Sequence, residues 1–508
     1  MKNLKSKLYK NLNVYLSIFT IIIIWQISGI GKVDLRISQT IDQQIMLLTS
    51  AKMHYFDYSS YEAAWNHHSP LLFVFTKITY YFVNFNNSSL GFYLLYSILL
   101  FSISIFIYHL LFELLNNKIH STLGSLIFVF DISSSTIGGK VIFDNRTLGI
   151  LFQTLILINC LSYLKSNKTI YIYLISISSV MQIYNLESYG VTVLFIYLYL
   201  VYIEKNYIKF FTHSVIGSIS TILYLSFVNN MNQELDEFFD LNILFHLNSI
   251  GITSQLQSID IVMVLENLFL ENNSSINLFA SLFIVILVFV SFSIKFKSKS
   301  IKENEKFIYV LLFGEIFHLY LTGPRFTSYS QILIMPLFVL FFIDVLGIFE
   351  KINKHKITGY LIFFLIFFTM QFGDVVLNRT SLIDGTFQET IKTYNKKLES
   401  SEPELILTWV GIDKYENVFF ENNSLPSTRL WWWHQMKYID EFYDKNYKMF
   451  DDQLLEDMFI KDVMKERPKI AIIDTSIVGP PDYFFDYIDK NFSLSKIEGE
   501  LKIYELNK

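Results

Sequence analysis

The chain carries a polar segment, residues 32–89, between two long apolar runs, and this segment holds the side chains best suited to chemistry. An acid, Asp42, stands near its start, and residues 65–72 near its end read Trp-Asn-His-His-Ser-Pro-Leu-Leu. A carboxylate can remove a proton from a hydroxyl group, and His67 and His68 can stabilise a negatively charged leaving group. We therefore treat residues 32–89 as the candidate catalytic loop.

Two later polar connections hold further candidates. The first contains Lys140 and Asp144, and the second contains Arg325 and Tyr329. Cations of this kind bind phosphate, and a second acid can orient an acceptor or a base. Simpler structural roles are open as well, because Asp144 is a good N-cap for a helix that begins at Asn145, and Arg325 can anchor a helix end at lipid headgroups.

The candidate loop also has simpler interpretations. Asp42 fits a solvated loop acid, and the histidines beside Trp65 fit an aromatic belt at the membrane surface. The choice between these roles and catalysis depends on the segments that flank the loop and on where they place it.

Composition assigns those elements to a membrane protein. Of the 508 residues, 52% are hydrophobic and 17% are charged, and the mean hydropathy is +0.37, outside the usual range of soluble globular chains. The net charge of -5 and the lack of a basic motif exclude a nucleic-acid binder. Because Cys160 is the only cysteine, neither an intramolecular disulfide nor a thiolate metal cluster can form.

Apolar runs long enough to cross a bilayer, about 20 residues each, predict about eleven spans. They cover residues 13–31, 90–112, 120–138, 145–164, 169–185, 189–203, 208–228, 276–295, 307–322, 328–349 and 357–373. The lysine-rich start before the first run, with no small-residue cleavage site after it, predicts an uncleaved anchor.

Lysine clusters decide whether residues 71–83 form another span. This run is short and contains Lys77, so it fits either a short span or an interfacial helix. If it does not cross, the lysines within residues 295–306 and 351–356 join the N-terminal lysines on the cytoplasmic side, as the positive-inside rule requires. We therefore expect residues 71–83 in the outer interface of a plasma membrane, with a cytoplasmic N-terminus.

This topology brings the candidate residues to one side of the membrane. The loop 32–89 and the connections that carry Lys140, Asp144 and Arg325 all lie outside. We expect an α-helical polytopic membrane domain over residues 1–373 and a soluble extracytoplasmic α/β domain over residues 374–508. In that tail, apolar runs predict strands, and helical periodicity predicts helices. The strands are Leu405–Trp409, Ile470–Ile473 and Leu501–Leu506, and the helices are Phe387–Leu398 and Leu454–Glu466.

The loop resembles the first outer loop of C-type glycosyltransferases (the GT-C fold), which take sugars from polyprenyl-phosphate carriers. The resemblance is to the branch of protein O-mannosyltransferases and the lipid A aminoarabinose transferase. In that branch the loop begins with Asp-Glu and ends with a run like Trp-Asp-His-Lys-Pro-Pro-Leu-Leu-Tyr. Here Asp42 and Gln43 stand at the start, and the run over residues 65–73 ends in Pro-Leu-Leu-Phe. Asp144 matches a second family acid, and the Gly-Pro-Arg turn at residues 323–325 loosely matches a later outer turn.

The resemblance implies an inverting glycosyltransferase. Asp42 would act as general base, assisted by Asp144, and the donor phosphate would be bound by His67, His68, Lys140, Arg325 and Tyr329. The donor would be a polyprenyl-phosphate sugar, and the acceptor a lipid, a glycan or a protein of the envelope. Related oligosaccharyltransferases use a divalent metal, but the sequence contains no clear metal cluster, so we expect no cofactor. Gln43, His68 and Ser69 depart from the family pattern, which leaves open a catalytically silent scaffold.

Ionisable residues within the predicted spans suggest another class. Glu315 and His318 share one helix face, and Asp344 lies in the next span. They could form the proton relay of a transporter or flippase, although pairing among themselves explains them as well, and we favour pairing. In the tail, residues 431–434 read Trp-Trp-Trp-His, which suits sugar stacking or, more simply, a hydrophobic docking seam.

Overall fold

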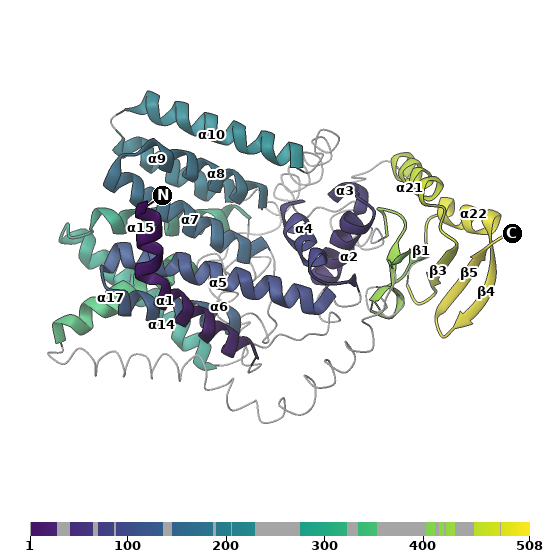
Figure 1. The fold of residues 1–508 in the computed structure, drawn as a ribbon, viewed down its shortest axis with the longest axis horizontal. Helices are drawn as coiled ribbons and strands as arrows, with labels where there is room; N and C mark the ends of the chain where they lie inside the picture. The colour runs from purple at the N-terminus through teal and green to yellow at the C-terminus, as the bar shows by residue number, and fades with distance from the viewer. Residues whose placement is uncertain are drawn as a thin grey trace. The chain divides into compact units, whose positions relative to one another are not determined.

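The computed structural model divides the chain into two compact units (Figure 1). The first contains Met1–Asp34, Tyr96–Tyr224 and Thr253–Thr386, and the second contains Leu35–Leu95, Leu225–Ile252 and Phe387–Lys508. The structure describes residues 2–27, 41–64, 70–85, 88–135, 145–185, 189–204, 206–228, 275–322, 334–352, 402–411, 416–420, 423–431, 452–477 and 479–507. The predicted domain boundary after residue 373 lies outside these ranges.

The first unit consists of helices that coincide with the apolar runs of the sequence. A helix bonds all of its own backbone groups, so a long apolar run can adopt it without exposing polar backbone to an apolar surrounding. The helices are α1 (Lys2–Ile27), α5 (Ser88–Leu115), α6 (Lys118–Ser135), α7 (Asn145–Ser166), α8 (Thr169–Asn185), α9 (Gly190–Ile203), α10 (Tyr207–Val228), α14 (Ser275–Lys297), α15 (Glu303–Thr322) and α17 (Ile334–Ile352). The start of α5 and the end of α10 belong to the second unit.

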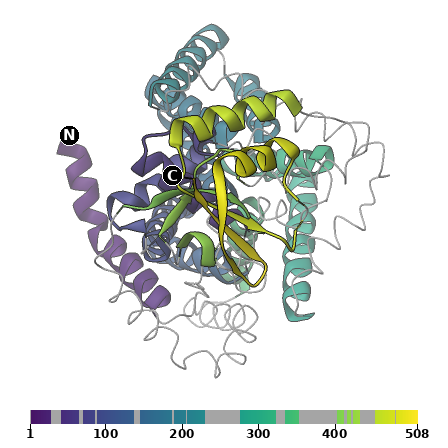
Figure 2. The ribbon, with the colours of Figure 1, turned by 90° about the vertical axis from the view of Figure 1, so that its right-hand side faces the viewer.

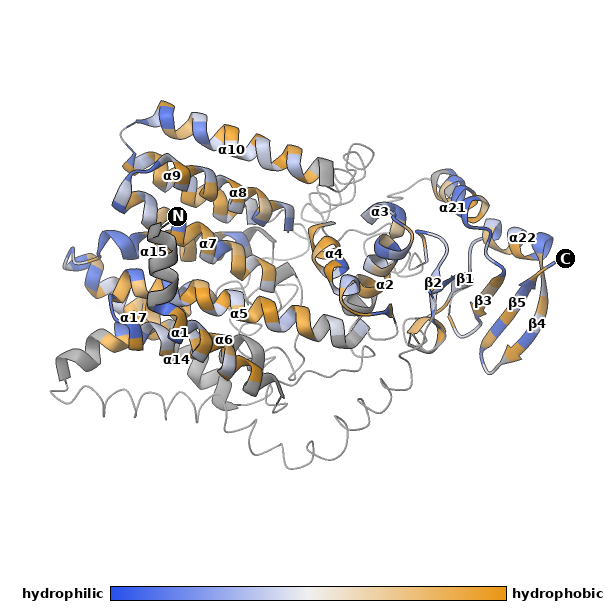
Figure 3. Cartoon of the chain, viewed as in Figure 1, coloured by the Kyte–Doolittle hydropathy of each residue, from blue (hydrophilic) through white to orange (hydrophobic). Residues whose placement is uncertain are grey.

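Each of these helices overlaps one predicted span, so the predicted helix positions are confirmed here. The last predicted span, residues 357–373, lies outside the described residues. Within the described ranges, three helices are long and apolar enough to cross a membrane: Leu94–Leu115, Thr147–Ser166 and Tyr207–Leu225. Figure 3 shows hydrophobic residues along α5 and α9, whereas α21 in the second unit shows hydrophilic stretches. The chain thus has the features of a membrane protein, and the total of about eleven spans remains a prediction.

Glycines allow close approach between helices of the first unit. A Cβ on Gly314 of α15 would lie 3.3 Å from the Cα of Thr192 on α9, so a larger residue would push these backbones apart by a few tenths of an ångström. On α7, a Cβ at Gly149 would collide with the hydroxyl of Tyr189, which lies at the start of α9. Small residues at such crossings are typical of helices that pack in a membrane.

The second unit begins with short helices from the candidate loop. They are α2 (Ile41–Tyr55), α3 (Ser60–Ala63), α4 (Pro70–Lys77) and the 3-10 helix η2 (Ile78–Tyr81). The hydroxyl of Ser50 donates to the carbonyl of Phe73 at 3.0 Å, and that of Tyr80 donates to the carbonyl of Leu47 at 2.9 Å. These bonds hold α4 and η2 against α2.

The C-terminal part of the second unit is a five-stranded sheet with strand order β2-β1-β3-β5-β4. The strands β1 (Glu404–Trp409), β2 (Ser424–Pro426) and β3 (Ile470–Asp474) run parallel, whereas β4 (Phe492–Glu498) and β5 (Leu501–Leu506) complete it in antiparallel pairing. Further helical segments are the π-helix η10 (Glu416–Phe420), α21 (Asp452–Glu466) and α22 (Asp482–Asn491).

Aromatic rings join the sheet to its helices. The ring of Phe484 on α22 lies 5.8 Å from that of Trp409 on β1 and 5.3 Å from that of Phe459 on α21. Figure 2 turns this end toward the viewer, with α21 and α22 next to the strands. The three rings therefore form one apolar core for the small α/β domain.

Most of this α/β domain agrees with the sequence prediction. The three predicted strands are β1, β3 and β5, and the helix predicted over Leu454–Glu466 is α21. The helix predicted over Phe387–Leu398 lies outside the described residues. The prediction missed β2, β4 and α22. β2 is only three residues long and ends in Pro426, and a register shift between Leu494 and Lys496 interrupts the alternation of β4.

Candidate functional site

The predicted site residues divide into one that lies in a described helix and several that do not. Asp42 stands in the first turn of α2, of which the backbone is described but the side chains of the first turn are not. The others lie outside the described residues: His67, His68, Lys140, Asp144, Arg325 and Tyr329. The helix expected to follow Asp144 does begin at Asn145. The proposed convergence of these residues therefore remains a prediction.

The helix that carries Asp42 is firmly packed after its first turn. All side chains from Ile45 to Met53 are buried. Packing on several sides of a helix fixes its position and orientation, so the first turn of α2 projects from a rigid support.

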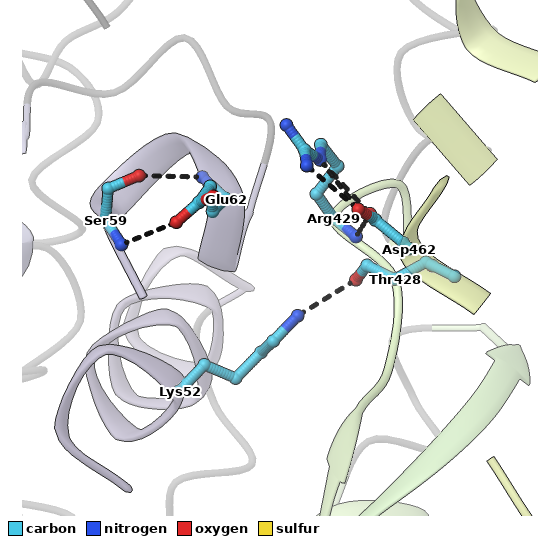
Figure 4. A network of polar contacts seen from close by, with 6 residues as sticks. All are labelled: Lys52, Ser59, Glu62, Thr428, Arg429 and Asp462. Atoms are coloured by element: carbon cyan, nitrogen blue, oxygen red, sulfur yellow. Dashed lines mark hydrogen bonds and ion pairs between the residues drawn. The ribbon is translucent and has the colours of Figure 1, made fainter. Parts of the chain in front are cut away.

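Lys52 is the unexpected member of this buried stretch. Its side chain is fully buried, and its Nζ donates to the carbonyl oxygen of Thr428 at 3.2 Å. Figure 4 shows the lysine reaching from α2 to the segment that follows β2. Nothing in the local sequence of the candidate loop indicates this contact with a residue 376 positions away.

Burial is the main influence on the charge of Lys52. It lowers the pKa of this amine from 10.5 to about 7. Acids among its charged neighbours oppose the shift, and cations add to it. The acids are Asp462 and Glu466, and the cations are Arg429 and Lys465. Lys52 therefore changes its charge near neutral pH, which an exposed lysine does not do.

A buried ion pair flanks the Thr428 carbonyl. The guanidinium of Arg429 donates to Asp462 on α21 through Nε at 3.1 Å and through Nη2 at 2.9 Å. The backbone N–H of Arg429 donates to the same carboxylate at 2.8 Å. Figure 4 shows these bonds beside Lys52. Because the bonds fix the backbone of residue 429, they also fix the preceding carbonyl that accepts from Lys52.

Tyr58 lies between two lysines from different parts of the chain. The Nζ of Lys465 on α21 is 4.1 Å from the centre of the Tyr58 ring, and that of Lys52 is 5.3 Å from it. Both distances fit cation–π attraction. The neighbouring Ser59 and Glu62 form a capping box that starts α3, so this short helix begins at a fixed point of the loop.

A run of rings forms a second contact between the loop and the C-terminal part of the unit. Phe85 stacks on Phe420 of η10 with centres 5.3 Å apart, and Tyr80 lies 6.3 Å from Phe85. Tyr80 in turn lies 6.0 Å from His54. Burial and the nearby cation Lys77 lower the pKa of His54, so this ring is neutral at physiological pH.

Within the first unit, the acids of the predicted spans separate into two networks. Glu315 accepts from Gln153 of α7 and pairs with His318, whose Nδ1 lies 3.2 Å from Oε2. Asp344 instead pairs with Lys295 at 2.6 Å, and Lys295 also bonds Glu305 at 2.8 Å. The expected pairing is thus confirmed for Glu315 and His318, but Asp344 belongs elsewhere.

The separation of the two networks argues against a proton relay. Glu305 and Glu315 are ten residues apart on α15, which corresponds to about 15 Å along the helix axis. Protons pass between groups in hydrogen-bond contact, directly or through water. The described residues therefore give no support to a chain from Glu315 to Asp344.

Of the tryptophan run in the tail, only Trp431 lies within the described residues. Trp431 is buried, and its ring lies 6.1 Å from that of Phe419 in an edge-to-face arrangement. Residues 432–434 lie outside the described residues. Trp431 thus serves as part of the apolar core of the second unit and is not exposed for sugar stacking.

Comparisons with known proteins and a search for metal ligands add no assignment. No protein-family model matches the chain, and no curated protein matches it. Within the part of the chain that the structure describes, no group of three or more His, Cys, Asp or Glu side chains is arranged to hold a metal ion. The site must therefore be judged from its own residues.

Sequence reasoning missed the residues that build the support of the loop. Lys52, Arg429 and Asp462 lie in segments far apart in the chain, and each looks locally like an ordinary surface charge. One signal was available, because Lys52 lies between Ala51 and Met53, shortly after the apolar run at residues 45–48 of α2. A lysine in such a position is either buried with a partner or marks an exposed helix face.

Proposed function

We propose that this protein is a membrane glycosyltransferase that moves a sugar from a polyprenyl-phosphate carrier to an envelope acceptor with inversion at the anomeric carbon. In this reaction Asp42 takes the proton of the acceptor hydroxyl while the acceptor oxygen bonds to the anomeric carbon. The bond from that carbon to the phosphate oxygen breaks, and the phosphate leaves with the electron pair. A general acid is not needed, because the phosphate is already a good leaving group.

The observation that carries the proposal is the position of Asp42 in the first turn of a helix whose following turns are buried. The positive end of the helix dipole favours an ionised acid there, and a general base must be ionised to accept a proton. The buried turns that follow hold this acid on a rigid support, and rigid positioning is a large part of catalysis in group transfer.

The remaining roles follow from charge. His67, His68, Lys140, Arg325 and Tyr329 would bind the donor phosphate, since cations and hydroxyl donors stabilise charge on a leaving phosphate. Asp144 would orient the acceptor or the base. The apolar helices support a lipid-linked donor, because a polyprenyl chain needs an apolar surrounding next to the reacting phosphate.

The test compares the wild type with Asp42→Asn. Each purified protein would receive a panel of polyprenyl-phosphate sugars and an extract of envelope acceptors, and transferred sugar would be measured. We expect transfer by the wild type and a loss of at least about 100-fold in the variant, the usual effect of removing a general base. The matched control is Asp57→Asn, an exposed acid of the same loop with φ of 54°, a conformation that asparagine also adopts.

Each outcome has a distinct meaning. Equal transfer by the wild type and Asp42→Asn would remove Asp42 as the base. Absence of transfer by the wild type with every donor would favour a transporter or a silent scaffold. A loss in Asp57→Asn as large as in Asp42→Asn would indicate disruption of the whole loop.

A further inference from the structure

Three large apolar side chains at the end of the candidate loop are exposed. Ile78 is 38% exposed, Tyr81 is 66% exposed and Phe82 is 75% exposed. They lie within five residues, in η2 and immediately after it, and we name them the apolar lip. Exposed residues of this size, gathered in one place, usually mark a surface that another apolar phase covers.

The opposite side of the same segment is tightly held. Leu71, Leu72 and Phe73 are buried, as are Thr79 and Tyr80. The sequence predicted that residues 71–83 lie together in the outer interface. The structure instead divides this segment into a buried part and an exposed part. Its first part packs within the second unit, and only the apolar lip remains exposed.

The apolar lip stands directly beside the start of a candidate membrane span. Gly91 in the first turn of α5 faces Thr79 and Val83 so closely that a Cβ there would collide with both side chains. The hydroxyl of Tyr80 lies 3.2 Å from that of Ser88, the first residue of α5. The candidate span begins at Leu94, only three residues after Gly91, or about 5 Å along the helix.

These contacts indicate what covers the apolar lip. We propose that the apolar lip inserts into the bilayer between the lipid headgroups and the acyl chains, and so fixes the catalytic loop against the membrane surface. The first turn of α5 must lie at the membrane boundary if α5 crosses, and the apolar lip is attached to that turn. Tyrosine at this level matches the aromatic belts of membrane proteins, and phenylalanine suits the apolar face of an interfacial segment.

Lys77 fits the same position. It ends α4, one residue before the apolar lip, and its side chain is half-buried. Lysine at a membrane boundary places its stem along apolar groups and its ammonium among the headgroup phosphates. The depth expected for the apolar lip is about 5–10 Å into the headgroup and acyl boundary.

The test measures depth directly and does not depend on enzymatic activity. The full chain, in a Cys160→Ser background, would carry a single cysteine through Tyr81→Cys or Phe82→Cys and be labelled with an environment-sensitive fluorophore. It would then be reconstituted into phosphatidylcholine and phosphatidylglycerol vesicles. Quenching by lipids with a doxyl group near the headgroup would be compared with quenching by lipids with one near the chain end. Lys461→Cys, at an exposed position of α21, is the matched control.

We expect blue-shifted emission at both lip positions and stronger quenching by the shallow doxyl group, with no quenching at position 461. Emission typical of water at positions 81 and 82 would overturn the proposal. Stronger quenching by the deep doxyl group would overturn it too, because it would indicate a span. A shift that disappears on dilution and does not respond to doxyl lipids would show that a second copy of the chain covers the apolar lip.

Discussion

The Nζ of Lys52 on α2 donates a hydrogen bond to the backbone carbonyl of Thr428, over a distance of 3.2 Å and across 376 positions of sequence. This bond joins the helix that carries Asp42 to the segment that follows β2. A change in the C-terminal domain can therefore alter the position of the proposed base without touching it. The tail is then part of the candidate site's support and not an independent appendage.

The charge of Lys52 predicts a pH-dependent stability. Because its pKa is about 7 in the folded protein and 10.5 in the unfolded chain, the unfolded chain binds more protons between these values. Stability from this group is therefore gained as pH rises from about 7 to 10.5 and is lost as pH falls through 7. The full span corresponds to no more than about 5 kcal/mol.

Lys52→Met checks this by removing the amine while keeping the length of the side chain. Unfolding free energies of the wild type and the variant would be measured in detergent from pH 7 to pH 10. We expect the unfolding free energy of the wild type to increase relative to that of the variant as pH rises. The control is Lys461→Met, which removes an exposed lysine of α21 and should leave the slope unchanged. Parallel curves for the wild type and Lys52→Met would contradict the prediction.

The Arg429–Asp462 pair predicts that a small change of one side chain greatly lowers the stability of the protein. Asp462→Asn keeps the shape of the side chain but removes the negative charge that Asp462 places beside the buried guanidinium. Breaking a buried pair on one side costs about 3–5 kcal/mol. Urea unfolding followed by tryptophan fluorescence measures this loss. Asp457→Asn, at an exposed site on the same helix, should change stability by no more than about 0.5 kcal/mol, and an equal effect of both variants would argue against the pair.

The contact between Gln153 and Glu315 predicts an energetic coupling between α7 and α15. Both side chains are buried and bonded to each other, so removing either leaves the other without this partner. In a double-mutant cycle of Gln153→Leu and Glu315→Leu, we expect a coupling of about 1–2 kcal/mol in thermal unfolding. The control is a second cycle that combines Asn159→Leu with Glu315→Leu, because Asn159 bonds to Leu155 within its own helix. A coupling as small as that of the control would exclude a direct interaction.

Particular elements show how much of the fold can be predicted from the sequence. Helix positions in the first unit follow from apolar runs alone, and α9 was placed to within one residue. The strands β1 and β3 were found because buried parallel strands are continuous apolar runs. β4 was missed because its exposed face and its bulge break that signal.

The support of the site could not be predicted in the same way. Local patterns indicate which face of a helix is apolar, but not which distant segment covers it. The burial of Lys52 depends on Thr428, and the fixed position of Thr428 depends on Asp462. Such chains of dependence appear only once the chain is folded, whereas Asp42 could be singled out from its place at the start of a polar loop.

Membrane orientation is predicted by the lysines around the turn between α14 and α15. Lys295, Lys297, Lys299, Lys302 and Lys306 should lie in the cytoplasm. Single cysteines would be introduced through Ser300→Cys and Lys461→Cys, both exposed positions, in a Cys160→Ser background. An impermeant thiol reagent applied to intact cells should label position 461, and should label position 300 only after permeabilisation. Labelling of position 300 alone in intact cells would reverse the topology and move Asp42 to the cytoplasm, where donors of a different kind would have to be considered.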